Sequence, residues 1–96
     1  MARAQDGSLH ACWISGNNLV YRKYQGGSWS TLQTIASGGF MLYPRIAVDS
    51  TGKPAIVYLD DSLVGNYVLK FTRWTGASWT SPQVIGYGHY PSIAID

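Results

Sequence analysis

One heptapeptide occurs twice in the chain, and this repeat constrains the fold more than any other feature. The first copy, YPRIAVD, spans residues 43–49, and the second, YPSIAID, begins 47 residues later and spans 90–96. A second pair of matching segments spans residues 21–29 and 71–79, and each ends in Gly-x-Ser-Trp. The chain is therefore expected to contain two copies of one unit and the start of a third.

Each copy consists of short apolar or aromatic runs separated by turn residues, and no stretch shows helical periodicity. In residues 54–59 both alternating sets of side chains are apolar, as in a strand covered on both faces. Repeats of about 40 to 50 residues with four strands each are typical of β-propeller blades. We expect an all-β fold with two four-stranded propeller blades per chain.

Two blades cannot close a ring, because propellers contain about four to eight. We expect residues 1–42 to form blade one and residues 43–89 to form blade two. Residues 90–96 are expected to pair with residues 9–14 of a neighbouring chain and so supply the innermost strand of its blade one. Such a head-to-tail contact closes into a cyclic ring. The trimer is favoured and the tetramer comes next, while the alternative is that residues 1–4 pair with 9–14 and displace the donated strand.

The composition argues against several other partners. The charged fraction is 12% and the net charge is +2, with the basic residues scattered, so no nucleic-acid patch is expected. No apolar run approaches the ~20 residues of a membrane span. The single cysteine, Cys12, allows neither an intrachain disulfide nor a zinc site and is expected to be a small buried apolar residue. We expect no cofactor and no metal, and the expected partner is a further copy of the chain.

The repeated unit resembles the blades of bacterial sialidase-like and lectin-like repeat propellers. The residues that carry the resemblance are the heptapeptide, the Gly turn after it, and the aromatic-x-Gly-x-Ser-Trp elements at 24–29 and 74–79. The elements are also similar to those of small fucose-binding lectins, whose two-blade chains trimerise into six-bladed rings. That likeness implies sugar sites with an Arg, a carboxylate and a Trp. The chain contains no Glu, and residues 49–54 depart from the sialidase Asp box, so the resemblance supplies no catalytic residue and we expect no enzyme.

The loops at one end of the expected strands differ in length between the copies. The loop at 60–66 is five residues longer than its counterpart, and the linker after Ile35 is three residues longer than that after Ile85. Loops on a rigid scaffold carry function, so this end is the expected recognition face. Carboxylates and amides beside aromatic rings suit a neutral carbohydrate. The candidate ligand-binding residues are Asp60, Asp61, Tyr67, Asn17, His89, Tyr43 and Tyr90.

Other roles are open for several aromatic and charged residues. Tyr43 and Tyr90 recur with the repeat, which also fits packing at the start of a first strand, and Asp60 and Asp61 also fit a solvated loop. The expected structural residues are Trp29 and Trp79 as wedges between blades, Trp13 and Trp74 in the core, and His10 as a hydrogen-bonded residue of a half-buried strand.

The function favoured by these patterns is a self-assembling, multivalent, carbohydrate-binding module without catalysis. The alternative is a purely structural or engineered propeller fragment whose only activity is assembly.

Overall fold

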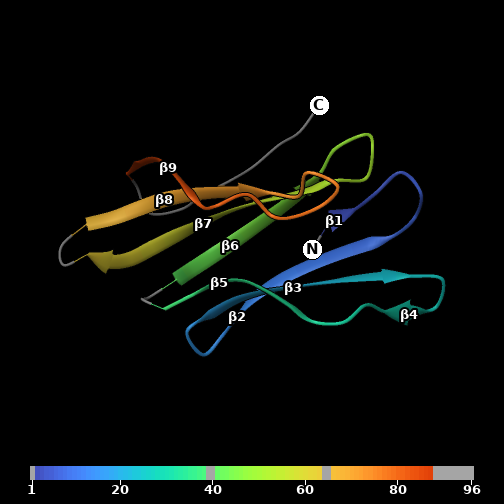
Figure 1. The fold of residues 1–96 in the computed structure, drawn as a ribbon, viewed down its shortest axis with the longest axis horizontal. Helices are drawn as coiled ribbons and strands as arrows, with labels where there is room; N and C mark the ends of the chain where they lie inside the picture. The colour runs from blue at the N-terminus through green and yellow to red at the C-terminus, as the bar shows by residue number, and fades with distance from the viewer. Residues whose placement is uncertain (1, 39–40, 64–65, 88–96) are drawn as a thin grey trace.

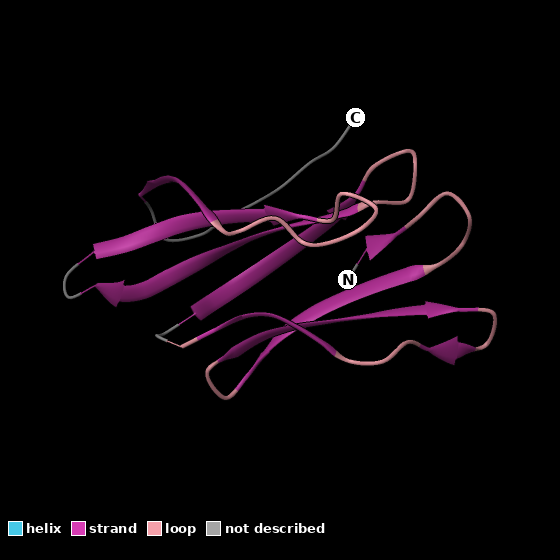
Figure 2. Ribbon diagram, viewed as in Figure 1, coloured by secondary structure: helices cyan, strands magenta, loops and turns pink. Residues whose placement is uncertain are grey.

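The computed structural model describes residues 2–38, 41–63 and 66–87, which form strands joined by turns (Figures 1 and 2). Sheet A contains β1 (Ala2–Arg3), β2 (Leu9–Ser15), β3 (Asn18–Gln25), β4 (Ser28–Trp29) and β5 (Gln33–Ser37). Sheet B contains β6 (Met41–Val48), β7 (Pro54–Leu63), β8 (Asn66–Arg73) and β9 (Gln83–Tyr87). Within these ranges we find no helix with the length and apolarity that a membrane crossing requires. The prediction of an all-β chain with two antiparallel sheets of about four strands is confirmed.

The strands of each sheet follow the order of the chain. The order in sheet A is β1-β2-β3-β4, with β5 also paired to β3, and the order in sheet B is β6-β7-β8-β9. Figure 1 shows the two sheets as stacked layers, and β6 of sheet B packs against β2 of sheet A. Strands that run antiparallel in chain order place alternate turns at opposite ends of the stack, as the sequence predicts.

The first turn of each sheet has the same backbone structure. The N–H of Gly7 donates to the carbonyl of Ala4 at 3.0 Å, and the N–H of Gly52 donates to the carbonyl of Asp49 at 3.0 Å. Both glycines have a left-handed backbone, with φ of 88° and 85°. Glycine adopts this conformation without the clash that a Cβ atom would cause. Residue 4 is therefore the structural equivalent of residue 49.

Strand pairing extends this equivalence over both sheets. Ala2 pairs with His10 in sheet A, at the position where Ala47 pairs with Ala55 in sheet B. The pairing of β3 with β5 in sheet A and the pairing of β8 with β9 in sheet B each have a register shift, and the two shifts occur at equivalent positions. The equivalent positions used below are His10 and Ala55, Cys12 and Val57, Trp13 and Tyr58, Tyr21 and Phe71, Tyr24 and Trp74, Lys23 and Arg73, Trp29 and Trp79, and Gln33 and Gln83.

The two sheets stack with non-equivalent faces in contact. Tyr58 of sheet B lies in the core between the sheets and is 1% exposed, whereas its equivalent Trp13 points away from sheet B and is 39% exposed. Conversely, Cys12 packs against this core, while alternation along β7 places Val57 on the face away from sheet A. Sheets related by a two-fold axis would bring equivalent faces together. These sheets are instead related as successive members of a stack. The buried residues of the core are Leu19, Tyr21, Met41, Ile56 and Tyr58.

The central strand of sheet B is covered on both faces. Every residue from Pro54 to Asp60 is buried, including the outward set to which Val57 belongs. The prediction from the continuous apolar run at 54–59 is therefore confirmed. Pro54 lies at the first position of β7, where a missing N–H is tolerated.

The predicted loop at 60–66 was wrong. Residues 60–63 continue β7 and β8 begins at Asn66, so most of that range is strand. Met41 and Leu42 belong to β6. Trp79 forms an isolated bridge before β9. Longer strands arise because cross-strand pairing outweighs the weak turn signal of Asp and Ser.

Candidate functional site between the two sheets

A cavity of about 190 Å³ lies between the two sheets, near the end that carries the β1–β2 and β6–β7 turns. Sheet A contributes polar side chains to its wall, and sheet B contributes a turn glycine, a proline and an indole ring. Pockets for drug-sized ligands typically occupy about 300 to 1,000 Å³, so this cavity suits one small ring. Its lining residues are His10, Tyr21, Lys23, Ser30, Gln33, Gly52, Pro54 and Trp74.

His10 is held in this wall by two hydrogen bonds. It is 1% exposed, its Nδ1 lies 2.6 Å from the hydroxyl oxygen of Tyr21, and its Nε2 lies 3.1 Å from Oγ of Ser8. The Ser8 hydroxyl donates to Oδ1 of Asp6 at 2.6 Å, and the same oxygen accepts the Ser8 backbone N–H at 2.9 Å. The prediction that His10 is a hydrogen-bonded strand residue is confirmed.

The hydrogen bonds fix where the protons lie. The hydroxyl of Ser8 donates its hydrogen bond to the Asp6 carboxylate, so its oxygen accepts a hydrogen bond from the Nε2–H of His10. The unprotonated Nδ1 then accepts the hydroxyl proton of Tyr21. Burial raises the pKa of Tyr21 to about 12, which keeps that proton in place. In this arrangement His10 cannot act as a base toward Ser8, so the network orients side chains rather than activating a nucleophile.

Burial sets the charge state of His10. Desolvation, aided by the nearby Lys23 ammonium, lowers the pKa of His10 below its usual 6.5, and the Asp6 carboxylate opposes this shift. The hydrogen bonds from Ser8 lower the pKa of Asp6 below 3.8. At neutral pH the wall thus contains a neutral imidazole and one ammonium group, that of Lys23.

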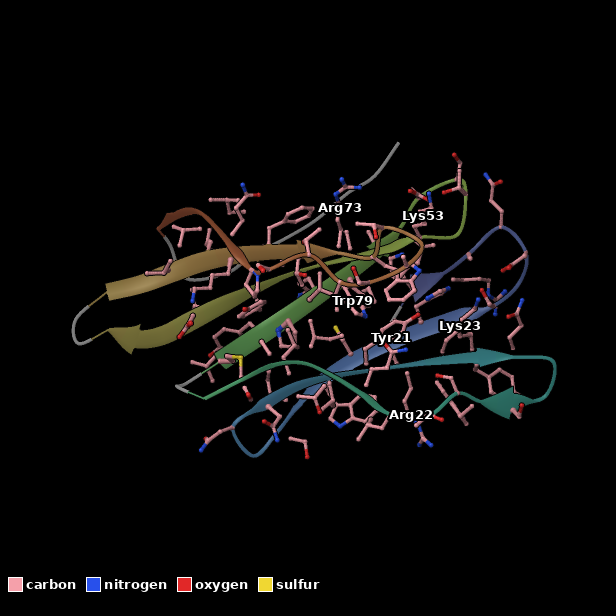
Figure 3. All side chains as sticks on the ribbon, in the orientation of Figure 1. Tyr21, Arg22, Lys23, Lys53, Arg73 and Trp79 are labelled. Carbon is pink, nitrogen blue, oxygen red and sulfur yellow. The ribbon has the colours of Figure 1, made fainter. Side chains whose placement is uncertain are left out.

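The aromatic side of the cavity is built by ring contacts within sheet B and across to sheet A. The ring of Tyr21 meets Trp79 edge-on at a centroid distance of 5.1 Å, and Trp79 meets Trp74 at 5.9 Å. The indole N–H of Trp79 donates to Oε1 of Gln33 at 2.9 Å. Figure 3 shows Tyr21 and Trp79 between the two ribbons, with Lys23 nearer the turn end of the stack. The prediction that Trp79 wedges between the repeats is confirmed.

Three of the sequence-predicted ligand residues have described side chains. Asn17 is exposed in the β2–β3 turn, where its carbonyl accepts the N–H of Gly38 at 2.9 Å. Tyr43 is 45% exposed at the irregularity within β6 and has a left-handed φ of 51°. Asp60 is 7% exposed within β7 and forms an ion pair with Lys70 at 2.8 Å. The reading of Asp60 as a solvated loop residue was therefore wrong.

The remaining predicted ligand residues have no described side chain. Asp61 belongs to β7 and Tyr67 to β8, and nothing is described beyond their backbone. His89 and Tyr90 lie outside the described residues, as does the strand predicted at 90–96. Within the described ranges no three His, Cys, Asp or Glu side chains gather in a way that could hold a metal ion.

The cavity residues were not selected from the sequence, apart from His10 and Trp74 as structural residues. Tyr21, Lys23 and Gln33 belong to ordinary strand patterns, and their shared position depends on how the sheets stack. One signal was present in the sequence: the position that holds the polar residue His10 in the first copy holds Ala55 in the second. A polar residue at a buried position of one copy alone indicates a hydrogen-bonding group that the other copy lacks.

Comparison of the chain with protein-family models, with curated proteins and with solved structures finds no match.

Proposed function

We propose that this chain assembles with copies of itself into a closed β-propeller, in which each sheet is one blade, and that the ring binds carbohydrate without catalysing a reaction. The observation that carries the proposal is the stacking of the two sheets through non-equivalent faces. Each outer face of the stack matches a face that the sheets already use to pack on each other. A contact of this kind is heterologous and closes into a ring when the rotation allows it.

The edge of sheet A is where the proposed assembly places the donated strand. Within the described residues, β1 pairs with only Leu9 and His10 of β2, whereas β6 pairs along β7 from Pro54 to Asp60. Residues 90–96 repeat the sequence of residues 43–49, which include the end of β6. We place residues 90–96 of a neighbouring chain beside β2, in the register that β6 uses on β7.

In this register the donated strand competes with β1 for the same part of β2. Ala2 and Arg3 occupy the positions of Ala47 and Val48, which in the donated strand correspond to residues 94 and 95. The donated strand therefore displaces β1 or pairs only beyond it, along Ala11–Ser15. A trimer gives six blades and a tetramer eight, within the range of about four to eight found in propellers.

The carbohydrate part of the proposal rests on the cavity between the sheets. An indole ring beside an amide, a hydroxyl and an ammonium group offers stacking and hydrogen bonds to a sugar ring. The equivalent space between two copies would contain Ala55, Phe71 and Arg73 in place of His10, Tyr21 and Lys23. We therefore place one sugar site in each chain, so that a ring multiplies a weak affinity through multivalency.

The assembly is tested by the native mass of the purified chain over a range of concentrations. A trimer or tetramer supports the proposal and fixes the blade count. A chain that stays monomeric at every concentration contradicts it.

The sugar site is tested by a glycan array followed by titration of any hit against Lys23→Ala. Loss of affinity with unchanged native mass supports the cavity as the site. Lys53→Ala is the matched control, because it removes the same charge from an exposed turn residue beside the cavity. Binding to no glycan leaves assembly as the activity of the chain.

A further inference from the structure

Trp29 and Trp79 occupy equivalent positions, yet their surroundings differ. Trp79 packs on Tyr21 and donates its indole N–H to Gln33 of the other sheet. Trp29 follows the equivalent turn of sheet A, contacts Tyr24 within its own sheet at a centroid distance of 5.1 Å, and is 44% exposed. An indole that is a wedge in one repeat is therefore on the surface in the other.

Equivalents of the residues that hold Trp79 lie on the β8–β9 side of the outer face of sheet B, beside the buried centre of β7. Phe71 is the equivalent of Tyr21, and Gln83 is the equivalent of Gln33. Phe71 pairs with Gln83 across β8 and β9, so both side chains point to the same face, away from sheet A. Phe71 is half-buried and Gln83 is exposed. The aromatic ring and the amide acceptor that hold Trp79 are thus both present a second time.

Trp29 and this second surface lie on opposite outer faces of the stack, so they cannot meet within one chain. We infer that Trp29 of one copy packs on the ring of Phe71 of a neighbouring copy and donates its indole N–H to Oε1 of Gln83 there. This inference rests on the proposed assembly and names the residues of its interface. The occupant of the exposed face of sheet A is a second copy, because this contact repeats between chains the contact that the two sheets already make within one chain.

A second aromatic residue supports the same occupant. Trp13 is 39% exposed on the outer face of sheet A, whereas its equivalent Tyr58 is 1% exposed in the core between the sheets. The expectation that Trp13 is a core residue was therefore wrong for the single chain. Docking a neighbouring sheet B onto this face would cover Trp13 together with Trp29.

The experiment measures the dissociation constant of the assembly for the unchanged chain and for three single variants, Trp29→Ala, Trp29→Phe and Gln83→Leu. The double variant that combines Trp29→Phe with Gln83→Leu is measured as well. Truncating a central aromatic residue weakens an interface by at least about 30-fold, so Trp29→Ala is expected to raise the dissociation constant by that factor or more. Loss of one hydrogen bond corresponds to about 3- to 10-fold. Trp29→Phe and Gln83→Leu should each show that smaller effect, and the double variant should be no worse than either one.

Trp79→Ala is the matched control, since it removes the equivalent indole from inside the chain. It should lower the stability of the dissociated, folded chain, as measured by far-UV circular dichroism, whereas Trp29→Ala should leave that stability unchanged. If the chain assembles and the Trp29 and Gln83 variants assemble equally well, the inferred contact is overturned and the proposed assembly stands. A chain that is monomeric without any substitution overturns both.

Discussion

Nδ1 of His10 lies 2.6 Å from the hydroxyl oxygen of Tyr21, and this hydrogen bond joins neighbouring strands in the core between the sheets. Tyr21→Phe removes the donor and leaves a buried imidazole nitrogen without its partner. An unsatisfied buried acceptor costs about 1 to 3 kcal/mol, so the free energy of unfolding should fall by that amount in a denaturant titration. Tyr24→Phe, in a half-buried ring of the same strand, is the control and should change stability much less. Equal effects of the two substitutions would contradict the assigned bond.

The depressed pKa of His10 predicts a loss of stability in mild acid. The unfolded chain binds a proton at this residue below pH 6.5, whereas burial keeps the folded imidazole neutral to lower pH. Between these two pKa values the unfolded state binds more protons, so stability falls as pH falls and levels off below the folded pKa. The measurement is the free energy of unfolding against pH, with His10→Gln as the comparison. The variant should lack the part of the slope that begins at pH 6.5.

A separate loss of stability is expected in stronger acid. Hydrogen bonds from Ser8 lower the pKa of Asp6, and hydrogen bonds from Thr51 and Lys53 lower the pKa of Asp49, in both cases from 3.8. Folded-state values below the unfolded ones give stability that is present above pH 3.8 and lost as pH falls through the lowered pKa. The His10→Gln variant should retain this second loss. If the variant also lacked the fall in stability below pH 3.8, the two pH-dependent losses of stability would not be separate.

Cys12 is expected to react slowly with alkylating agents while the chain is folded. Burial raises the pKa of its thiol to about 11 from 9.0, and the positive charges of the N-terminus and Arg45 act in the opposite direction. The thiolate is the reactive form, so the rate of reaction with iodoacetamide at about pH 8 should be about 100-fold below that of the unfolded chain. Mass spectrometry of the labelled chain with and without denaturant measures this ratio. A folded chain that reacts as fast as the unfolded one would place Cys12 on the surface.

The sequence predicts the sheets well because turn residues and strand patterns act locally. The Gly7 and Gly52 turns, the buried run of β7 and the equivalence of Trp29 with Trp79 can all be read from the repeat. The cavity could not be predicted in this way. Tyr21 and Trp79 are far apart in the chain, and a repeat does not state which face of one copy packs on which face of the next.

Strand length was also beyond the reach of local patterns. Asp60 follows a run of apolar residues. A carboxylate at that position predicts the start of a loop, yet Asp60 lies inside β7. The ion pair with Lys70 supplies the reason, because a carboxylate with a cation beside it on the same face of the neighbouring strand can stay in a nearly buried strand. A single sequence does not reveal that partner until the register of β7 against β8 is known.

Asp60 therefore offers a test that separates a structural role from a role in ligand binding. Asp60→Asn removes the charge that Lys70 meets at 2.8 Å in a site where Asp60 is 7% exposed. A hydrogen bond to a charged group contributes about 1.5 to 3 kcal/mol, and we expect a loss of stability near the lower figure because Lys70 is partly exposed. Lys70→Met and the double variant complete a double-mutant cycle in denaturant unfolding. A coupling energy near zero would contradict the ion pair. Unchanged glycan affinity in Asp60→Asn, measured where the variant is fully folded, would remove Asp60 from the binding residues and leave the cavity around Lys23 as the site.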